Sequence, residues 1–333
     1  MNKRGTIYVV VPAYNVEKFI HVALDSLLKQ TYKNWICLCM NDGSTDDTYK
    51  IMKQYARKDK RIQIFTQSNK GLTKTLNVLL NKVRGPYLAY LDADDAIHPQ
   101  MFELLMRALT ENHADVAECS AVRFIDALPE QAKEHLHFKD LRTELLTDMS
   151  IFLSHKTSKG AWINKWNKIY RWDKVKEVRF SEELTHEDDY FYNSIVNNKI
   201  QRKILVKYPF YFYRHNPSSL CGNVNWIRYQ QSGLNRIRLS WENFIKTNQV
   251  PVRYQKAFAY DLANDAYRMI LRKPLKKGKK DRKQIFNVAC VTLRKYIKDG
   301  VIETKYLSLM QRVHMWCTVH GWQRISYLLS KLT

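Results

Sequence analysis

Several features that would assign the chain to a class at once are missing from its 333 residues. The six cysteines form no C-x-x-C pair and no dense framework: they are Cys37, Cys39, Cys119, Cys221, Cys290 and Cys317. Reduced cytosolic thiols are therefore favoured over disulfides or a zinc site. No signal-type apolar segment opens the chain, and no apolar run approaches the roughly 20 residues that cross a bilayer. We expect a protein that is soluble or bound at a membrane surface.

A glycine-rich phosphate loop is also missing from the first predicted turn. The first predicted strand, Thr6–Val11, is followed by Pro12-Ala13-Tyr14-Asn15. A nicotinamide-dinucleotide fold or a P-loop needs glycines there, because its backbone must approach a phosphate closely. The turn argues against both. It also argues against a nucleotidyltransferase that makes nucleotide-sugars, an alternative that shares this type of sheet.

Acidic residues are few compared with basic ones. The chain has 55 Lys and Arg against 32 Asp and Glu, a net charge of +23. Such a surplus attracts polyanions, namely nucleic acid, anionic lipid or phosphorylated substrates, and the charge alone does not choose among them. A protein that binds nucleic acid or another anionic polymer is therefore an alternative, although no recognised DNA- or RNA-binding module is present.

Strands and helices alternate over the first third of the chain. The predicted strands are Thr6–Val11, Trp35–Met40, Arg61–Thr66 and Tyr87–Leu91, and helices are expected over Val16–Lys29, after Ser44 or Thr45, and up to about Val83. This alternation predicts an α/β fold, a mostly parallel, Rossmann-like sheet flanked by helices. The polar loops that follow the strands then meet at one edge of the sheet, where such folds bind their ligands.

Three carboxylates follow the fourth predicted strand. Asp92 and Asp94 lie two positions apart, so both side chains can face one side of an extended backbone. Carboxylates are costly to bury unless they are paired or bound to a cation. A hard divalent cation, held by one or two carboxylates and by phosphate oxygens, suits this pair. Asp95 is expected instead to cap the predicted helix Met101–Leu109.

Three motifs in order carry a resemblance to a known family. Val11–Asn15, Asn41–Asp46 and Tyr90–Asp95 resemble family 2 glycosyltransferases of the GT-A fold, over residues from about 7 to 110. Trp166–Arg171, Glu187–Phe191 and Tyr211–Arg214 resemble the bacterial branch that builds surface polysaccharides. The resemblance fades after about residue 220.

The resemblance implies a site for a nucleotide-sugar. Uracil is expected near Pro12, Tyr14, Glu17 and Asp42, and the donor near Asp92, Ala93 and Asp94, so we predict a UDP-sugar rather than a GDP-sugar. Asp92 and Asp94 would hold ribose and an Mg²⁺ or Mn²⁺ ion on the diphosphate, while Lys70 or Lys74 and the late-loop Arg214 would also contact the donor. On the residues alone, Tyr14 is equally a surface aromatic and Asp42 a turn residue.

Transfer to a sugar hydroxyl also needs a base. The family pattern selects Asp188 as this base and Glu187 as the residue that orients or shares the acceptor, with inversion at the anomeric carbon. The alternative is a cluster of acids that caps a helix, and Asp189 is assigned to that role. Trp166 and Lys168 are predicted to line the acceptor side, although a tryptophan at this spacing also fits a packed helix face.

The resemblance places a catalytic domain at residues 1–222, with a nucleotide-sugar half up to about residue 110 and an acceptor half at 111–222. Residues 223–333 form a basic helical C-terminal region. Its final stretch alternates tryptophans and aliphatic residues with arginines, which suits a helix in a membrane interface or one packed on the catalytic domain. We expect a glycan or lipid-linked acceptor in capsule or lipopolysaccharide synthesis. The predicted location is peripheral, on the cytoplasmic face of the bacterial inner membrane.

Overall fold

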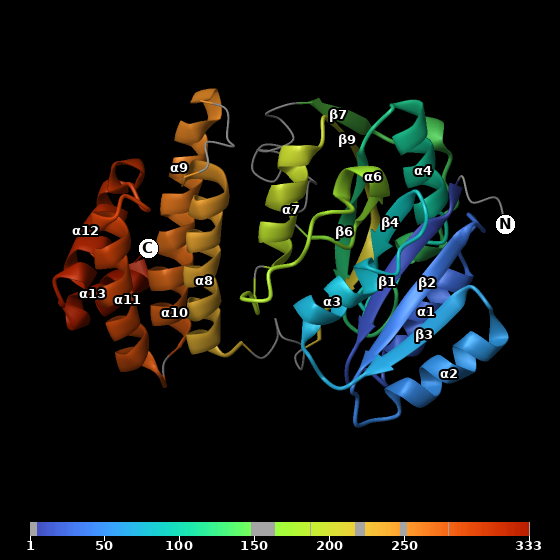
Figure 1. Ribbon diagram of the computed structural model, residues 1–333, viewed down its shortest axis with the longest axis horizontal. Helices are drawn as coiled ribbons and strands as arrows, with labels where there is room; N and C mark the ends of the chain where they lie inside the picture. The colour runs from blue at the N-terminus through green and yellow to red at the C-terminus, as the bar shows by residue number, and fades with distance from the viewer. Residues whose placement is uncertain are drawn as a thin grey trace. The chain divides into compact units, whose positions relative to one another are not determined.

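The computed structural model describes residues 5–147, 164–186, 188–216, 224–246, 252–278 and 280–332. The chain forms two compact units (Figure 1). Unit 1 comprises Met1–Phe180 and Tyr192–Pro217, and unit 2 comprises Ser181–Phe191 and Ser218–Thr333. Helix α7 (Asp188–Lys199) begins in unit 2 and continues into unit 1.

Unit 1 contains one mixed sheet in the order β3-β2-β1-β4-β8-β6-β9-β5, with β7 paired to β9. Its strands are β1 (Ile7–Ala13), β2 (Trp35–Asp42), β3 (Ile62–Gln67), β4 (Tyr87–Tyr90), β5 (Ala96–Ile97), β6 (Val116–Phe124), β7 (Thr143–Thr147), β8 (Lys168–Arg171) and β9 (Arg202–Arg214). Strands β3, β2, β1 and β4 are parallel to one another, whereas β8 is antiparallel to both β4 and β6. The predicted α/β class with a mostly parallel sheet flanked by helices is confirmed.

Helices connect these strands. They are α1 (Ile20–Leu28), α2 (Thr48–Lys58), α3 (Leu72–Leu80), α4 (Met101–Glu111) and α6 (Trp172–Val175), with 3₁₀ turns at η2 (Glu130–Lys133) and η3 (Phe138–Asp140). The prediction of a helix from Val16 onward is wrong in its start, because α1 begins at Ile20. The backbone amides of Asn15–Glu17 donate instead to side chains that follow β2, namely Ser44 and Asp46 of the loop and Thr48 at the start of α2.

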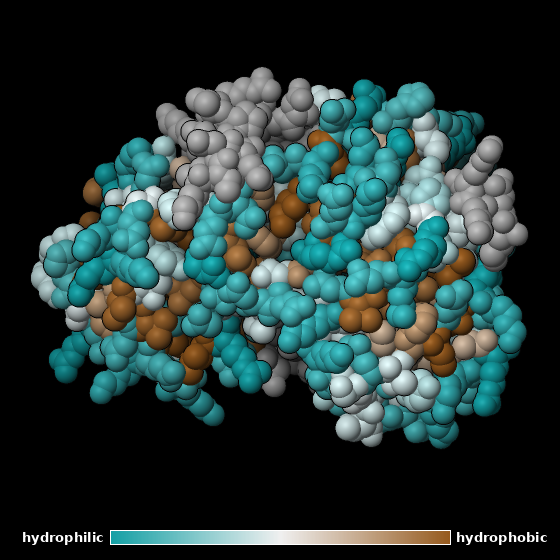
Figure 2. All heavy atoms as spheres, in the orientation of Figure 1, coloured by the Kyte–Doolittle hydropathy of each residue, from teal (hydrophilic) through white to brown (hydrophobic). Residues whose placement is uncertain are grey.

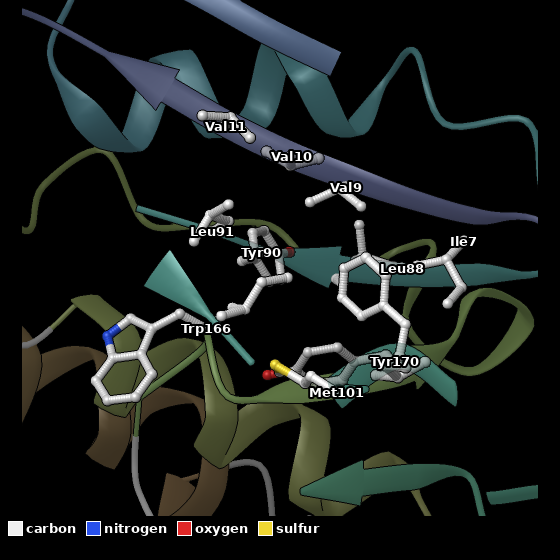
Figure 3. Packing of buried hydrophobic residues seen from close by; sticks show 14 of the residues in the cluster. Ile7, Val9, Val10, Val11, Leu88, Tyr90, Leu91, Met101, Trp166 and Tyr170 are labelled. Atoms are coloured by element: carbon white, nitrogen blue, oxygen red, sulfur yellow. The ribbon is translucent and has the colours of Figure 1, made fainter. Parts of the chain in front are cut away.

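The core of unit 1 lies along β1 and β4. Val9, Val10 and Val11 are fully buried because helices or neighbouring elements cover both faces of this strand, as expected in a parallel sheet (Figure 3). On β4, the ring of Tyr90 packs edge-on against Tyr170, and its hydroxyl hydrogen-bonds that of Tyr192 on α7 at 2.9 Å. This packing fixes the strand that carries the acidic loop.

Unit 2 is helical. Besides the first residues of α7 it contains α8 (Trp226–Ser240), α9 (Val252–Ala266), α10 (Lys273–Lys277), α11 (Arg282–Lys298), α12 (Leu309–Val319) and α13 (Gln323–Leu332), with π-helical turns at η4 (Trp241–Lys246) and η5 (Tyr267–Arg272) and a 3₁₀ turn at η6 (Thr304–Tyr306). The predicted helical C-terminal region is confirmed. Among the described residues, no helix is both long and apolar enough to span a membrane.

Candidate nucleotide-sugar site

The loops after β1 and β2 are tied together at the carboxyl edge of the sheet. The amide of Thr45 donates to Asn15 Oδ1 at 2.9 Å, and the amide of Asp47 donates to Glu17 Oε2 at 2.9 Å. The ring of Tyr14 remains 48% exposed beside the half-buried Pro12. Tyr14 therefore lies at the rim with its ring exposed and available for stacking. The carboxylate of Glu17 accepts a hydrogen bond from the loop after β2.

Asp42, the last residue of β2, is buried. Its Oδ1 accepts hydrogen bonds from the amide of Lys70 and from Gln67, and its Oδ2 accepts one from the amide of Gly71, at 2.7–2.9 Å. Asp42 thus fixes the loop after β3, and the side chain of Lys70 on that loop is exposed. Gly43 follows with φ of 74°, and a Cβ there would lie 2.6 Å from the amide nitrogen of Asn69, so only glycine fits this close approach.

Asp92 and Asp94 are half-buried just past the end of β4, and Ala93 between them is buried. The ammonium of Lys165, itself buried, lies 3.2 Å from Asp92 Oδ1. Asp94 Oδ2 accepts a hydrogen bond from the side-chain amide of Asn216 at 3.1 Å. The two residues lie on one loop, each with its own neighbour, and their joint binding of a cation stays a prediction.

Asp95 lies beneath this pair and is fully buried. Its Oδ1 accepts a hydrogen bond from the Arg214 amide and its Oδ2 one from the hydroxyl of Tyr211, both at 2.7 Å. Burial, and then the nearby charges of Asp94 and Asp92, raise the pKa of this carboxyl well above its usual range. The prediction that Asp95 caps the following helix is wrong, since Gln100 directly precedes α4.

Arg214 hydrogen-bonds the backbone of the acidic loop. Its Nε donates to the backbone oxygen of Asp94 at 2.8 Å and its Nη1 to that of Ile125 at 2.7 Å. The guanidinium also lies over the rings of Phe19 and Phe124, and burial lowers its pKa from the usual value. In this structure Arg214 holds the backbone of the acidic loop, and a contact with the donor diphosphate stays a prediction.

The acidic loop supplies only some of the ligands that a divalent cation needs. No group of three or more His, Cys, Asp or Glu side chains that could hold a metal occurs among the residues that the structure describes. Asp94 and Asp92 are oxygen donors at a half-buried rim, so they offer a hard cation one or two ligands and leave the others to phosphate oxygens or water. Mg²⁺ is commonly bound in this manner at phosphate-binding sites.

The two predicted acceptor residues are engaged within unit 1. The indole of Trp166 is buried and stacks on Tyr211 and Tyr213, with ring centroids 4.1 and 5.6 Å away. Lys168 is buried with its ammonium 3.4 Å from Glu118, and burial lowers its pKa to about 8. Both side chains are thus occupied within the fold, although Trp166 lies in a turn and not on a helix face, and a contact with an acceptor stays a prediction.

Asp188 is the first residue of α7. The amides of Thr185 and His186 just before it donate to Ser232 Oγ on α8, at 3.2 and 3.0 Å, so α8 fixes the approach to this helix within unit 2. Glu187 lies outside the described residues. The roles of both carboxylates stay predictions.

The sequence did not single out four residues that support the acidic loop: Asp95 in this role, Lys165, Tyr211 and Asn216. Lys165 directly precedes one segment that carried the resemblance, and Tyr211 lies within another. The sequence therefore offered a signal for both residues. Asn216 is marked by nothing but its place two residues after Arg214. Their contacts join positions more than 70 residues apart, so only the folded chain shows them.

The parallel sheet with an acidic loop past its central strand, followed by helices, defines a GT-A-like fold. The chain is similar to S. aureus TarS 1–349 solved with UDP-GlcNAc, with a TM-score of 0.71, 18% identity, and coverage of 98% of this chain and 90% of that one. It is also similar to mannosyltransferase PcManGT from Pyrobaculum calidifontis in complex with GDP-Man and Mn²⁺, with a TM-score of 0.53, 13% identity and coverage of 98% and 84%. At these identities the likeness concerns the fold.

The family model "Glycosyl transferase family 2" matches residues 8–170, and the chain belongs to this family. Glycosyltransferase EpsJ of Bacillus subtilis is 30% identical over 64% of this chain and 62% of EpsJ. Glycosyltransferase YibD of Escherichia coli is 28% identical over 72% of this chain and 71% of YibD. Glycosyltransferase GlyA of Streptococcus pneumoniae is 32% identical, but the chain spans only 31% of GlyA, and it spans less than two thirds of EpsJ.

Proposed function

We propose that the protein transfers a sugar from a UDP-sugar to a glycan or lipid-linked acceptor of a bacterial surface polysaccharide. The observation that carries this proposal is the acidic loop Asp92–Asp95 at the carboxyl end of β4, supported from below by Arg214 and Tyr211 and from the side by Lys165. Ligands of open α/β sheets bind at this edge. Family membership supports sugar transfer as the chemistry performed there.

A uridine nucleotide is favoured as the donor group. Tyr14 offers an exposed ring at the rim for stacking on a base, with Pro12 beside it. Asp42 and Glu17 shape the two flanking loops through their hydrogen bonds to backbone amides. The fold neighbour TarS was solved with UDP-GlcNAc and with UDP, which supports the same nucleotide for this chain.

Asp94, with Asp92, is proposed to hold Mn²⁺ or Mg²⁺ together with the donor diphosphate. The ion would neutralise charge on the departing diphosphate and so help the leaving group. The chain's own residues orient this site: Arg214 fixes the backbone oxygen of Asp94, and Lys165 balances the charge of Asp92. The neighbour PcManGT was solved with GDP-Man and Mn²⁺, which supports a metal-dependent reaction.

Asp188 is proposed to take the proton of the acceptor hydroxyl during attack, with Glu187 orienting the acceptor. The Glu187–Phe191 segment resembles the family pattern for this base, and the amides that precede it are fixed on α8. A direct attack opposite the leaving diphosphate gives inversion at the anomeric carbon. An acceptor built on a lipid carrier would place the reaction at the cytoplasmic face of the inner membrane.

The test is a screen of nucleotide-sugars for donor hydrolysis and transfer, with and without Mn²⁺. We expect free UDP as the released product, since pyrophosphate would indicate a nucleotidyltransferase. Removal of the metal with a chelator is expected to abolish turnover, and added Mn²⁺ or Mg²⁺ to restore it. Binding of polynucleotides without any metal-dependent binding of UDP would instead support an anionic-polymer-binding protein.

Two variants separate the proposed roles. Asp94→Asn removes a metal ligand, so we expect UDP binding in the presence of Mn²⁺ and transfer both to fall, by on the order of 100-fold. Asp188→Asn should keep donor binding and lower transfer by about 100- to 10,000-fold, as expected for loss of a base. Isothermal titration with UDP and a turnover assay measure the two effects. Transfer by Asp188→Asn at the parent's rate would remove Asp188 from the mechanism.

A further inference from the structure

The C-terminal hairpin of α12 and α13 exposes its apolar side chains. On α12 these are Leu309, Met310, Val313 and Trp316, and on α13 they are Ile325, Leu328 and Leu332. Their exposed fractions lie between 42% and 76%, and each set follows the spacing of one helix face. Trp322, in the turn, packs its ring edge-on against Trp316 with centroids 4.9 Å apart. The two stripes therefore join into one surface, the apolar face of the hairpin.

The buried side of the hairpin carries several polar side chains beside the buried Met315 and Cys317. His314, Thr318 and Ser326 are fully buried and hydrogen-bond one another, and His314 also bonds the hydroxyl of Tyr267 at 3.0 Å. Helices of water-soluble proteins normally bury their apolar stripe and expose their polar one. This hairpin instead exposes an apolar stripe and buries polar side chains beside Met315 and Cys317. The buried polar side chains are hydrogen-bonded within the protein, and no element among the described residues covers the apolar face.

The hairpin is well defined despite this arrangement. Ser308 forms a reciprocal capping box with Gln311 at the start of α12. Gly321, with φ of 81°, ends the helix, and the amide of Trp322 donates back to the oxygen of Cys317 at 2.8 Å. The exposed apolar face is therefore the outcome of specific local signals at both ends of α12.

Positive charge surrounds this face. No acidic residue follows Glu303 in the sequence, whereas Arg312, Arg324 and Lys331 are exposed on the hairpin. Arg282 contacts the hairpin, because its guanidinium lies 3.8 Å from the ring centroid of Tyr327 on α13, and Lys276, Lys277, Lys280 and Lys283 are exposed nearby in the sequence. Apolar side chains and tryptophans bordered by cations match the boundary between acyl chains and anionic headgroups.

Other occupants fit this face less well. A second copy placed face to face would bring the same basic border against itself, which is repulsive in a symmetric contact. The cations and the two tryptophans could contact nucleic acid, but the aliphatic side chains form no hydrogen bonds or ion pairs with phosphates or bases.

We propose that the apolar face of the hairpin α12–α13, with the adjoining cations, docks the protein on an anionic lipid bilayer. The apolar side chains enter the interface, and the lysines and arginines contact the headgroups. The proposal extends the membrane part of the proposed function. It does not depend on sugar transfer, so vesicle binding and transfer are measured separately and each can fail alone.

The experiment is co-sedimentation of the full chain with vesicles of phosphatidylcholine, with and without phosphatidylglycerol. We expect binding to the anionic vesicles. The double variants Trp316→Ser/Trp322→Ser and Leu328→Ser/Leu332→Ser should each weaken it by on the order of tenfold or more. The matched control is Val291→Ser, an exposed apolar residue of α11 outside the hairpin, which should bind like the parent. Circular dichroism confirms that each variant is folded.

The cations are tested in the same assay. Lys276→Glu/Lys277→Glu/Lys280→Glu should weaken binding to anionic vesicles by on the order of 100-fold. Vesicles should also shift tryptophan emission of the parent to the blue, with a smaller shift in Trp316→Ser/Trp322→Ser. Absence of vesicle binding by the parent, or unchanged binding by both hairpin variants, overturns the proposal. A parent dimer that these variants dissociate, with no vesicle binding by the parent, overturns it in favour of a second copy.

Discussion

At the scale of single residues, the acidic loop depends on a shared hydroxyl. Tyr211 donates to Asp95 Oδ2 and accepts from the amide of Asp92 at 3.2 Å. One side chain on β9 thus links the buried carboxylate to the backbone that presents Asp92 and Asp94. Burial raises the pKa of Tyr211 as well, which keeps the hydroxyl protonated as this role requires.

We expect Tyr211→Phe to leave Asp95 with one hydrogen bond fewer in a buried place. The free energy of unfolding should fall by about 1–3 kcal/mol. The affinity for UDP in the presence of Mn²⁺ should also fall, because the acidic loop loses its support. Denaturant unfolding and titration calorimetry measure the two quantities.

The matched control is Tyr55→Phe, which removes a hydroxyl that donates to Asp25 at 2.7 Å between α1 and α2. It should cost stability without changing the affinity for UDP. An equal loss of affinity in both variants would show that the effect comes from general destabilisation.

At the scale of elements, loops beyond the strands take their shape from side chains of other elements. The segment before α1 is held by the loop after β2, and the loop after β3 is held by Asp42 of β2. These bonds explain why α1 starts later than its apolar spacing predicts. Three loops from separate parts of the sequence therefore form one rim.

The hairpin element carries a pH dependence of its own. Burial lowers the pKa of His314 from its usual 6.5 to about 4. Between these values the unfolded chain binds a proton that the folded chain does not, so stability falls as the pH falls from about 6.5 to about 4. The loss should reach on the order of 3 kcal/mol at the acid end.

We expect His314→Gln, which can still hydrogen-bond Tyr267 and Ser326, to flatten this part of the stability profile of unit 2. Helical signal followed in denaturant at several pH values provides the measurement. The control is His320→Gln, an exposed histidine at the end of α12, which should keep the parent's profile. A slope that persists in His314→Gln would assign it to other groups.

At the scale of the whole molecule, the net charge of +23 has a proposed use. An anionic bilayer attracts the chain and raises its effective concentration near any acceptor in the same bilayer. Figure 2 shows hydrophobic residues on the surface of the helical unit among hydrophilic ones. On the apolar face of the hairpin, exposed apolar side chains and exposed cations occur together.

If docking and transfer are coupled in this way, anionic vesicles should raise transfer to a lipid-linked acceptor by roughly tenfold. Transfer to a soluble acceptor of the same glycan should not change. High salt should abolish the difference, since it screens surface charge. An equal stimulation of both reactions would point to a direct effect of lipid on the enzyme.

The sequence alone determined the class of fold and predicted where the candidate site lies. Apolar β-branched strands alternating with amphipathic helices require a buried parallel sheet, and polar loops past strand ends then share one edge. Asp92 and Asp94 were predicted in this way, because their position past the end of β4 depends only on local spacing and strand direction.

Only the tertiary structure decided how that edge is supported and which helix faces are covered. Asp95 looked like a helix cap, yet β9 supplies its partners from 116 and 119 residues away along the chain. The final helices fitted either packing or a membrane interface from their periodicity, and only the tertiary structure shows His314 and Ser326 buried and Trp316 exposed. Local pattern fixes which side chains share a face, whereas the direction of that face depends on distant neighbours.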